Sequence, residues 1–265
     1  MIRMANRLFR WEQKRLEKRT EAAKKRGGVS ASLFLEGDMN ALSDADCFFF
    51  YGSRVWPKGL LTIFFPDEEH AELTVAEFLP TSGMLPALYR SALKECGRVG
   101  VDAVHTVRNP KCGFEFGKIT GISFLYEWSE YMLCLEMEAL AEAGCKEAPA
   151  EQEGTVCIEK DEAPEGDGTV RYRLLCDGQK AAECRILAAA GGTQCYLFGL
   201  KTEETFRRKG MATALLFAIA KEYKDYDGAV MRLQVSSKNV PAERLYRKLG
   251  FRTEEEREYY KTKEC

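Results

Sequence analysis

The pattern of apolar and polar residues is most regular between residues 196 and 251. Apolar runs at residues 196–200 and 229–235 have the length and composition of strands. Residues 213–219 between them repeat apolar side chains at helical spacing, and a second helical segment follows at 242–249. The pattern therefore predicts the order strand, turn, helix, strand, helix.

The turn between the first strand and the first helix is basic and contains a glycine. It reads Arg207-Arg208-Lys209-Gly210-Met211-Ala212. The first amides of a helix have no intrahelical partner and carry partial positive charge, so such a turn is suited to bind an anion. Gly210 would let the backbone approach that anion, Ala212 keeps the first helical turn slim, and the basic side chains add charge that phosphates can use.

Two motifs in this stretch resemble one known family. The pattern Arg207-x-x-Gly210-x-Ala212 resembles the Q/R-x-x-G-x-G/A signature of the GCN5-related N-acetyltransferases, the GNAT superfamily. The second motif is similar to that family's N-x-x-A-x-x-L-Y-x-x-x-G-F, and here it reads Asn239-x-x-Ala242-x-x-Leu245-Tyr246-x-x-Leu249-Gly250-Phe251. The resemblance covers residues 193–255. It implies a GNAT fold, of the α+β class with an α/β-type mixed sheet flanked by helices.

The resemblance also implies a cofactor and a reaction. The loop amides would bind the pyrophosphate of acetyl-coenzyme A, and Asn239 would contact its pantetheine arm. The strand at residues 198–202 would diverge from its neighbour and free backbone groups for that arm, while Tyr246 would act as the general acid. The cofactor-binding residues expected on this basis are Phe198, Leu200, Thr202, Arg207, Arg208, Lys209, Gly210, Met211, Ala212, Thr213, Asn239, Ala242 and Tyr246.

Other phosphate-binding patterns fit the sequence less well. Gly178-Gln179-Lys180 lacks the first glycine and the hydroxyl of a P-loop, and Gly166-Asp167-Gly168 lacks the third glycine of a dinucleotide-binding turn. Two structural alternatives stay open: residues 207–212 as no more than a charged helix start, and Tyr246 as a core aromatic beside Leu245 and Leu249.

The first half of the chain shows a similar order of elements without the motifs. Strands are expected at 32–35, 47–51, 60–65, 73–79 and 101–107, a helix at 83–96, and a closing strand pair at 122–126 and 130–137. Residues 79–85 stand where the cofactor loop should be, but they hold no basic cluster. We therefore expect two tandem GNAT-like domains, the first degenerate; an unrelated α+β domain is the alternative.

Composition and turn signals suggest four segments. We expect a basic N-terminal helix within residues 1–28, a degenerate GNAT-like domain at 29–142, an acidic linker at 143–153 and an acetyl-CoA-binding GNAT domain at 154–265. In the last domain, a strand at 155–158 and a hairpin about Asp177-Gly178 should precede the cofactor strand.

Charge and length limit the function further. The chain has 265 residues, with 39 basic and 41 acidic side chains, which argues against a dedicated nucleic-acid binder. No apolar run approaches a membrane span, no secretory signal is visible, and ten cysteines without a Cys-x-x-Cys pair suit a reducing cytoplasm. With two histidines, no metal site is expected. The basic helix expected at 4–27 could dock on nucleic acid or a membrane surface. It could also be a solvated helix that buries one narrow stripe of side chains against the body of the protein.

These observations predict a cytoplasmic N-acetyltransferase. It would transfer an acetyl group from acetyl-CoA to a primary amine by direct attack through a tetrahedral intermediate. The general base is unassigned: Glu183, Glu203 and Glu204 are glutamates within the domain, and a water-relayed base or an already neutral amine is equally possible. A small-molecule or peptide amine is the expected partner, without nucleic acid or membrane, in a monomer or homodimer. A non-catalytic CoA-binding or regulatory module is the first alternative, and a nucleic-acid-binding protein is the second.

Overall fold

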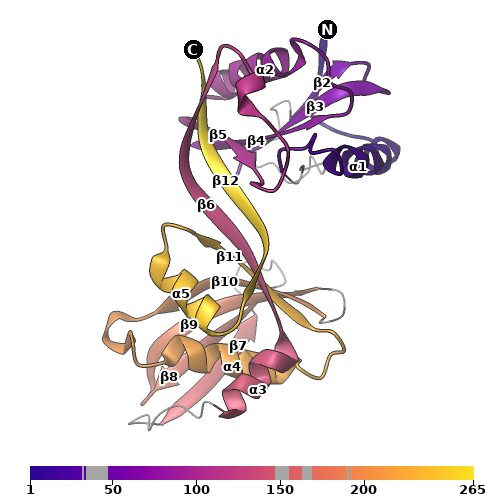
Figure 1. Ribbon diagram of the computed structural model, residues 1–265. Coiled ribbons are helices and arrows are strands. Elements are labelled where there is room, and N and C mark those ends of the chain that lie inside the picture. The colour runs from indigo at the N-terminus through magenta and orange to yellow at the C-terminus, as the bar shows by residue number, and fades with distance from the viewer. Residues whose placement is uncertain (32, 34–46, 147–154, 163–168, 190, 192) are drawn as a thin grey trace. The chain divides into compact units, whose positions relative to one another are not determined.

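The computed structural model describes residues 1–31, 33, 47–146, 155–162, 169–189, 191 and 193–265. The chain forms two compact units, one of Met1–Ser129 with Glu256–Cys265 and the other of Glu130–Glu255. Strands β6 (Ile122–Glu136) and β12 (Arg252–Glu264) each contribute residues to both units (Figure 1).

The first unit is built on a mixed sheet with the strand order β1-β2-β3-β4-β5-β12-β6. Its first five strands are β1 (Ile2–Ala5), β2 (Phe48–Gly52), β3 (Pro57–Phe64), β4 (His70–Glu77) and β5 (Ala103–Arg108). Strands β4 and β5 pair in parallel, whereas β1 to β4 pair antiparallel in succession and β12 pairs antiparallel with β5. The parallel pair is joined by α2 (Met84–Val99), as a crossover connection requires.

Helices cover both faces of this sheet because its strands are apolar on both sides. Phe48 and Phe50 pack in one cluster with Leu16 of α1 (Arg10–Lys24). Phe49 lies between them in sequence, points to the opposite face and packs in a second cluster with α2. A strand alternates its side chains between faces, so the three consecutive phenylalanines serve two cores.

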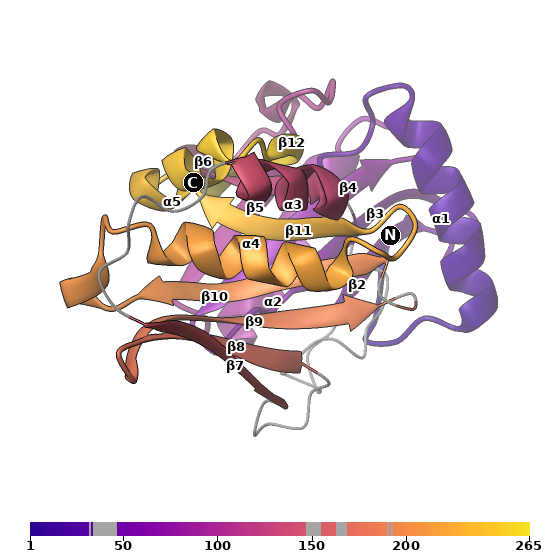
Figure 2. The same cartoon turned by 90° about the horizontal axis from the view of Figure 1, so that it is seen from below.

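The second unit has the strand order β6-β11-β10-β9-β8-β7. Its strands other than β6 are β7 (Val156–Glu162), β8 (Thr169–Cys176), β9 (Gln179–Ala189), β10 (Gln194–Thr202) and β11 (Val230–Ser236). Its helices are α3 (Met137–Lys146), α4 (Met211–Tyr223) and α5 (Val240–Lys248). Helix α4 lies along the sheet beside α3 (Figure 2), and a Cβ on Gly144 would come within 2.7 Å of Phe217 Cγ, so a glycine permits this close approach.

Most of the expected elements are present, with four corrections. The N-terminal helix begins at Arg10 and is preceded by β1, and the expected strand pair at 122–137 is one continuous strand, β6. Helix α3 and strand β12 were not expected at all. The residues expected as a strand at 32–35 lie almost entirely outside the described residues.

Strand β12 is rich in charge, and α3 stands at the start of an acidic stretch that resembles a linker, so composition hid both elements. Helix α3 follows an acidic pattern on the surface but buries Met137, Leu140 and Ala141. Strand β12 holds many glutamates and lysines, and Tyr259 and Thr262 are its buried positions. Their burial depends on strand and helix partners distant in sequence, which a local pattern does not show.

The units found by contacts divide the chain differently from the expected segments. The boundary lies between Ser129 and Glu130, and the C-terminal residues 256–265 belong to the first unit. Of the expected linker at 143–153, α3 occupies the part up to Lys146, and residues 147–154 are outside the description.

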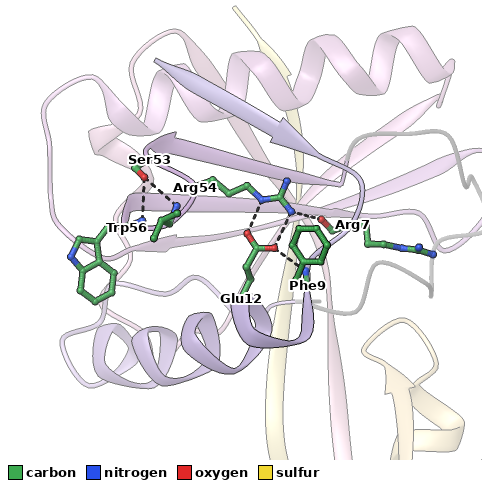
Figure 3. A network of polar contacts seen from close by, with 7 residues as sticks. Arg7, Phe9, Glu12, Ser53, Arg54 and Trp56 are labelled. Atoms are coloured by element: carbon green, nitrogen blue, oxygen red, sulfur yellow. Dashed lines mark hydrogen bonds and ion pairs between the residues drawn. The ribbon is translucent and has the colours of Figure 1, made fainter.

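An ion pair with a buried carboxylate holds α1 against the rest of the first unit (Figure 3). The Glu12 carboxylate accepts hydrogen bonds from Arg54 Nε at 2.7 Å, Arg54 Nη2 at 2.9 Å and the Phe9 backbone N–H at 2.8 Å. Arg54 Nη2 also donates to the Arg7 carbonyl. Burial alone would raise the pKa of Glu12, but the hydrogen bonds from Arg54 and Phe9 outweigh it and hold that pKa below its usual value.

Other basic side chains of α1 are used within the same unit. The Arg19 guanidinium lies 4.8 Å from the Trp56 ring centroid and 4.4 Å from that of Phe78, and Arg15 lies 4.6 Å from Trp11. Some of the basic side chains of this helix are therefore engaged in cation–π contacts within the unit.

We expect Arg54→Ala to destabilise the protein by about 1.5–3 kcal/mol at neutral pH, because it leaves the buried Glu12 carboxylate without its charged partner. A lowered folded-state pKa adds stability above the usual pKa of 4.5 and loses it as the pH falls further, so the difference between variant and wild type should shrink on acidification. Denaturant unfolding at several pH values measures this. Arg90→Ala, which removes an exposed pair with Glu264, is the control and should change little; an equal loss in both variants would contradict the assignment.

Candidate functional site

The parallel ladder between β10 and β11 stops half-way along β10. Residues 194–197 of β10 pair with 230–233 of β11, and the last pair is Leu197 with Leu233. Beyond it β11 continues only with β6, up to Ser236. In this fully described part of the sheet, residues 198–202 of β10 have no partner on β11, which matches the expected divergence. Backbone groups on that side of β10 are therefore free for another molecule.

A bulge marks the point of divergence. Phe198 pairs with Arg185 of β9, but the next pair is Lys201 with Glu183, so β10 holds one extra residue there. Gly199 lies in the bulge with φ 59°, which favours glycine. The bulge redirects the end of β10 away from β11 while β10 keeps its pairing with β9.

The basic turn leads directly into α4, and the first amides of this helix are unpaired. After the short 3₁₀ helix η4 (Glu204–Phe206), Arg208 and Gly210 both have left-handed backbones, with φ 66° and 79°. Gly210 is the N-cap of α4 and has no side-chain cap. The first intrahelical bond is from Ala214 N–H to the Gly210 carbonyl at 2.9 Å, so the amides at 211–213 have no helical partner.

The second motif forms α5 and its two ends. Asn239 is the N-cap, and its Oδ1 accepts from the Ala242 N–H at 3.3 Å. At the other end Gly250 has φ 94°, and the Phe251 N–H donates to the Tyr246 carbonyl at 3.0 Å, which closes the helix. Asn239 and Gly250 of the motif therefore cap the two ends of the helix, and Asn239, Ala242 and Tyr246 also line a cleft.

That cleft, of about 530 Å³, is enclosed by the end of β10, the turn, the start of α4 and α5. Its lining residues are Leu200, Lys201, Thr202, Phe206, Arg207, Arg208, Gly210, Met211, Ala212, Thr213, Asn239, Pro241, Ala242, Leu245 and Tyr246. All expected cofactor residues except Phe198 and Lys209 are among them. The Lys209 ammonium instead lies 5.6 Å from the Phe206 ring centroid. The volume is within the range of small-molecule sites.

Comparisons with known proteins agree on the fold. The family model described as FR47-like protein, which is GNAT-related, matches residues 177–260. A GCN5-related N-acetyltransferase from Sphaerobacter thermophilus superposes with a TM-score of 0.68 and 12% identity, covering 100% of this chain and 95% of that one. A tandem GNAT protein from the clavulanic acid biosynthesis pathway gives a TM-score of 0.59 at 14% identity, covering 83% of this chain and 82% of that one. The GCN5-related N-acetyltransferase from Kribbella flavida gives 0.51 at 15% identity, with 77% and 86% covered.

The chain has the GNAT fold. The resemblance inferred from the two motifs is thereby confirmed, and the family match falls on the stretch that carries both. Among curated proteins, none matches the sequence. None of the described helices is both long and apolar enough to cross a membrane.

Tyr246 is the most buried of the titratable residues that line the cleft of this GNAT fold. Its side chain is 6% exposed, and its ring meets Phe251 edge-on with centroids 5.6 Å apart. Burial, with a smaller effect of Cys184, raises the pKa of Tyr246 to about 12. Within the described part of the chain its hydroxyl has no recorded hydrogen-bond partner. Tyr246 thus keeps its proton at neutral pH and can donate it into the cleft.

The three glutamates considered as bases are engaged elsewhere. Lys180 Nζ lies 2.9 Å from the Glu183 carboxylate and 3.3 Å from that of Glu203. The hydrogen bond from Lys180 holds the pKa of Glu183 below its usual range despite partial burial. Glu204 is exposed and pairs with Arg207. No carboxylate or imidazole lines the cleft within the described residues, so the structure offers none of these three as a base there.

Sequence reasoning missed four lining residues: Lys201, Phe206, Pro241 and Leu245. Leu245 could have been found, because it follows Ala242 at helical spacing and lies on the same face of α5. Phe206 belongs to a 3₁₀ turn between β10 and the first motif, and no periodic signal points to it.

We expect Tyr246→Phe to leave the free energy of unfolding nearly unchanged, because it removes a hydroxyl without a recorded partner. Tyr246→Ala should lose about 3–5 kcal/mol, since it empties the space beside Phe251. Chemical denaturation of both variants measures this. A large loss in the phenylalanine variant would show that the hydroxyl has a structural role.

Proposed function

We propose that the chain is an N-acetyltransferase that uses acetyl-CoA, with the cofactor site and the chemistry in its second unit. One observation carries the proposal. The unpaired end of β10, the free amides at the start of α4 and the buried Tyr246 line the same cleft. The named GNAT structures of similar fold support it.

The residues of the cleft fit the pyrophosphate and the pantetheine arm of coenzyme A. Free amides at 211–213 and the left-handed Arg208 and Gly210 suit a pyrophosphate, and a Cβ at Gly210 would meet nothing within 4 Å, so the approach is open. Arg207 adds charge, although its guanidinium now contacts Glu204 at 3.3 Å and the Thr202 carbonyl at 3.4 Å. The unpaired residues 198–202 can bond the amides of the pantetheine arm as a neighbouring strand would.

Acetyl-CoA would supply an acetyl group activated as a thioester. The acceptor amine forms a bond to the carbonyl carbon, the carbon–sulfur bond breaks, and the nitrogen loses a proton. Unpaired backbone N–H groups at the end of β10 would stabilise charge on the carbonyl oxygen. Tyr246, which lines the cleft, would protonate the departing sulfur.

Burial affects both partners of that proton transfer. A phenol whose pKa is about 12 is a weaker acid than a free one, against a thiol pKa of about 8.5 in water. The same apolar surroundings disfavour a thiolate and so raise the pKa of the coenzyme thiol, which narrows the difference between the two pKa values. The nitrogen of an amine that arrives neutral becomes cationic on attack and must still lose one proton; because no carboxylate or imidazole among the described residues lines the cleft, that proton leaves to water, and the Tyr246 phenolate regains one from water.

That lack of a carboxylate or imidazole also favours a second candidate, a CoA-binding module without turnover. Both candidates predict cofactor binding in the same cleft. They differ in whether the protein releases thiol from acetyl-CoA, and therefore in whether a substitution at Tyr246 changes the rate of that release.

Calorimetric titration of acetyl-CoA into the protein tests the shared part of the proposal. We expect binding in wild type and an affinity at least about tenfold weaker in Arg207→Glu, which replaces attraction to phosphate by repulsion. Lys221→Glu, with the same charge change near the other end of α4, is the control and should bind as wild type. If wild type shows no binding, or if Arg207→Glu and Lys221→Glu bind acetyl-CoA with equal affinity, the proposed cofactor site is wrong.

Thiol release in the presence of an amine panel separates enzyme from module. Tyr246→Phe should lower kcat by about 10²–10⁴ while the dissociation constant of acetyl-CoA stays the same, because the hydroxyl acts only on the departing sulfur. Binding without thiol release for any amine in wild type would favour the non-catalytic module.

A further inference from the structure

The two units repeat one arrangement of strand, turn, helix and strand. In the first unit four residues of β4 pair in parallel with β5, ending at Leu73 and Thr106, and α2 connects the two strands. In the second unit four residues of β10 pair in parallel with β11, ending at Leu197 and Leu233, and α4 connects them. In both units the first strand continues past the last pair.

The connecting helices begin in the same way. Gly83 and Gly210 are their N-caps, with φ 73° and 79°, and neither has a side-chain cap. Each is followed by a buried methionine, Met84 or Met211. Gly83 in the first unit therefore corresponds to Gly210 in the second, although the sequences around them differ.

The two units differ in what occupies the space where the parallel strands diverge. In the first unit the chain's own residues 28–31 lie there. Ser30 N–H donates to the Val75 carbonyl at 2.9 Å, and Ser30 Oγ accepts from the Val75 N–H at 3.0 Å. The Ser30 carbonyl accepts from the N–H of Asn109, just past the end of β5, at 2.6 Å. Ser30 is thus bonded to both diverging strands and is fully buried.

The neighbours of Ser30 extend this contact. The Glu77 N–H donates to the Gly28 carbonyl at 2.7 Å, and Val29 forms an antiparallel bridge with Ala76. The fit is tight, because a Cβ on Gly28 would lie 2.9 Å from the Glu77 carbonyl oxygen. Residues 28–31 hence satisfy the β4 backbone groups that correspond to the free ones on β10.

The helix start of the first unit is also poorer in donors for an anion. Pro86 is the third residue after Gly83, as Thr213 is after Gly210, and proline has no amide hydrogen. Leu85 stands where the second unit has the slim Ala212. Residues 80–82 are Pro-Thr-Ser, where the second unit has the basic residues 207–209.

We propose that residues 28–31 are a built-in substitute for the pantetheine arm, so that the chain binds one coenzyme molecule, in the second unit only. The stoichiometry rests on the proposed function; the filled groove does not. The first unit keeps the strand geometry of a cofactor site because its own chain supplies the missing partner.

Gly83 and Gly210 offer a matched pair of variants for testing this. Both positions have left-handed backbones and open space for a Cβ, and aspartate tolerates this conformation better than most residues. In calorimetry with acetyl-CoA we expect one molecule bound per chain in wild type and in Gly83→Asp, and none in Gly210→Asp. Two molecules per chain in wild type, or one remaining in Gly210→Asp, would overturn the proposal.

Hydrogen exchange tests the filled groove without any ligand. The Val75 and Glu77 amides, which donate to residues 28–31, should be strongly protected in the free protein, and acetyl-CoA should not change them. Amides within 198–202 should gain protection only when acetyl-CoA is added. Fast exchange at Val75 and Glu77, or protection there that depends on acetyl-CoA, would overturn the filled groove. If wild type binds no acetyl-CoA while these amides are protected, the proposed function and the stoichiometry fail but the filled groove stands.

Discussion

The central constraint in both units is the point where two parallel strands stop pairing. Each strand beyond it carries backbone donors and acceptors that need partners if they are shielded from water. In the second unit that point comes after Leu197 and Leu233, and the strand end opens into a cleft. In the first unit it comes after Leu73 and Thr106, and residues 28–31 fill the gap. The same geometry thus gives an open groove in one unit and a packed interior in the other.

The open groove combines features that a folded protein normally avoids. Its helix start is uncapped, its strand end is unpaired, and its tyrosine hydroxyl is without a recorded partner among the described residues. Phe198, Gly199, Lys201 and Gly210 are exposed, so water can bond the backbone there in the free protein. A ligand with a diphosphate followed by an arm that contains amides would replace that water at the helix start and at the strand end together. We regard the lack of a protein partner at both the helix start and the strand end, more than any single residue, as the physical basis of the proposed site.

Local sequence patterns predicted the elements around the cleft well. The hairpin at Asp177-Gly178, the helix start at Gly210 and the helix end at Gly250 were predicted because glycines and a turn pair mark backbone conformations directly. Helix α3 was missed although Met137, Leu140 and Ala141 recur at helical spacing, because it stands at the start of an acidic stretch that resembles a linker; strand β12 was missed because it is dominated by charged residues and only distant partners bury Tyr259. The division into units was equally hidden, because β12 returns residues from the end of the chain to the first unit.

By itself the sequence identified the residues expected to bind and react in the second unit: a basic turn at 207–209, the glycine at 210, and Tyr246 in a later helix. It also showed that the first half lacks the basic turn. Only the tertiary structure decided what the first half does with its groove, because Ser30 meets Val75 and Asn109 through contacts 45 and 79 residues apart along the chain. Most of these bonds join backbone groups, which any residue small enough to fit can provide, and the one side-chain bond, from the Val75 N–H to the Ser30 hydroxyl, is too little to form a motif.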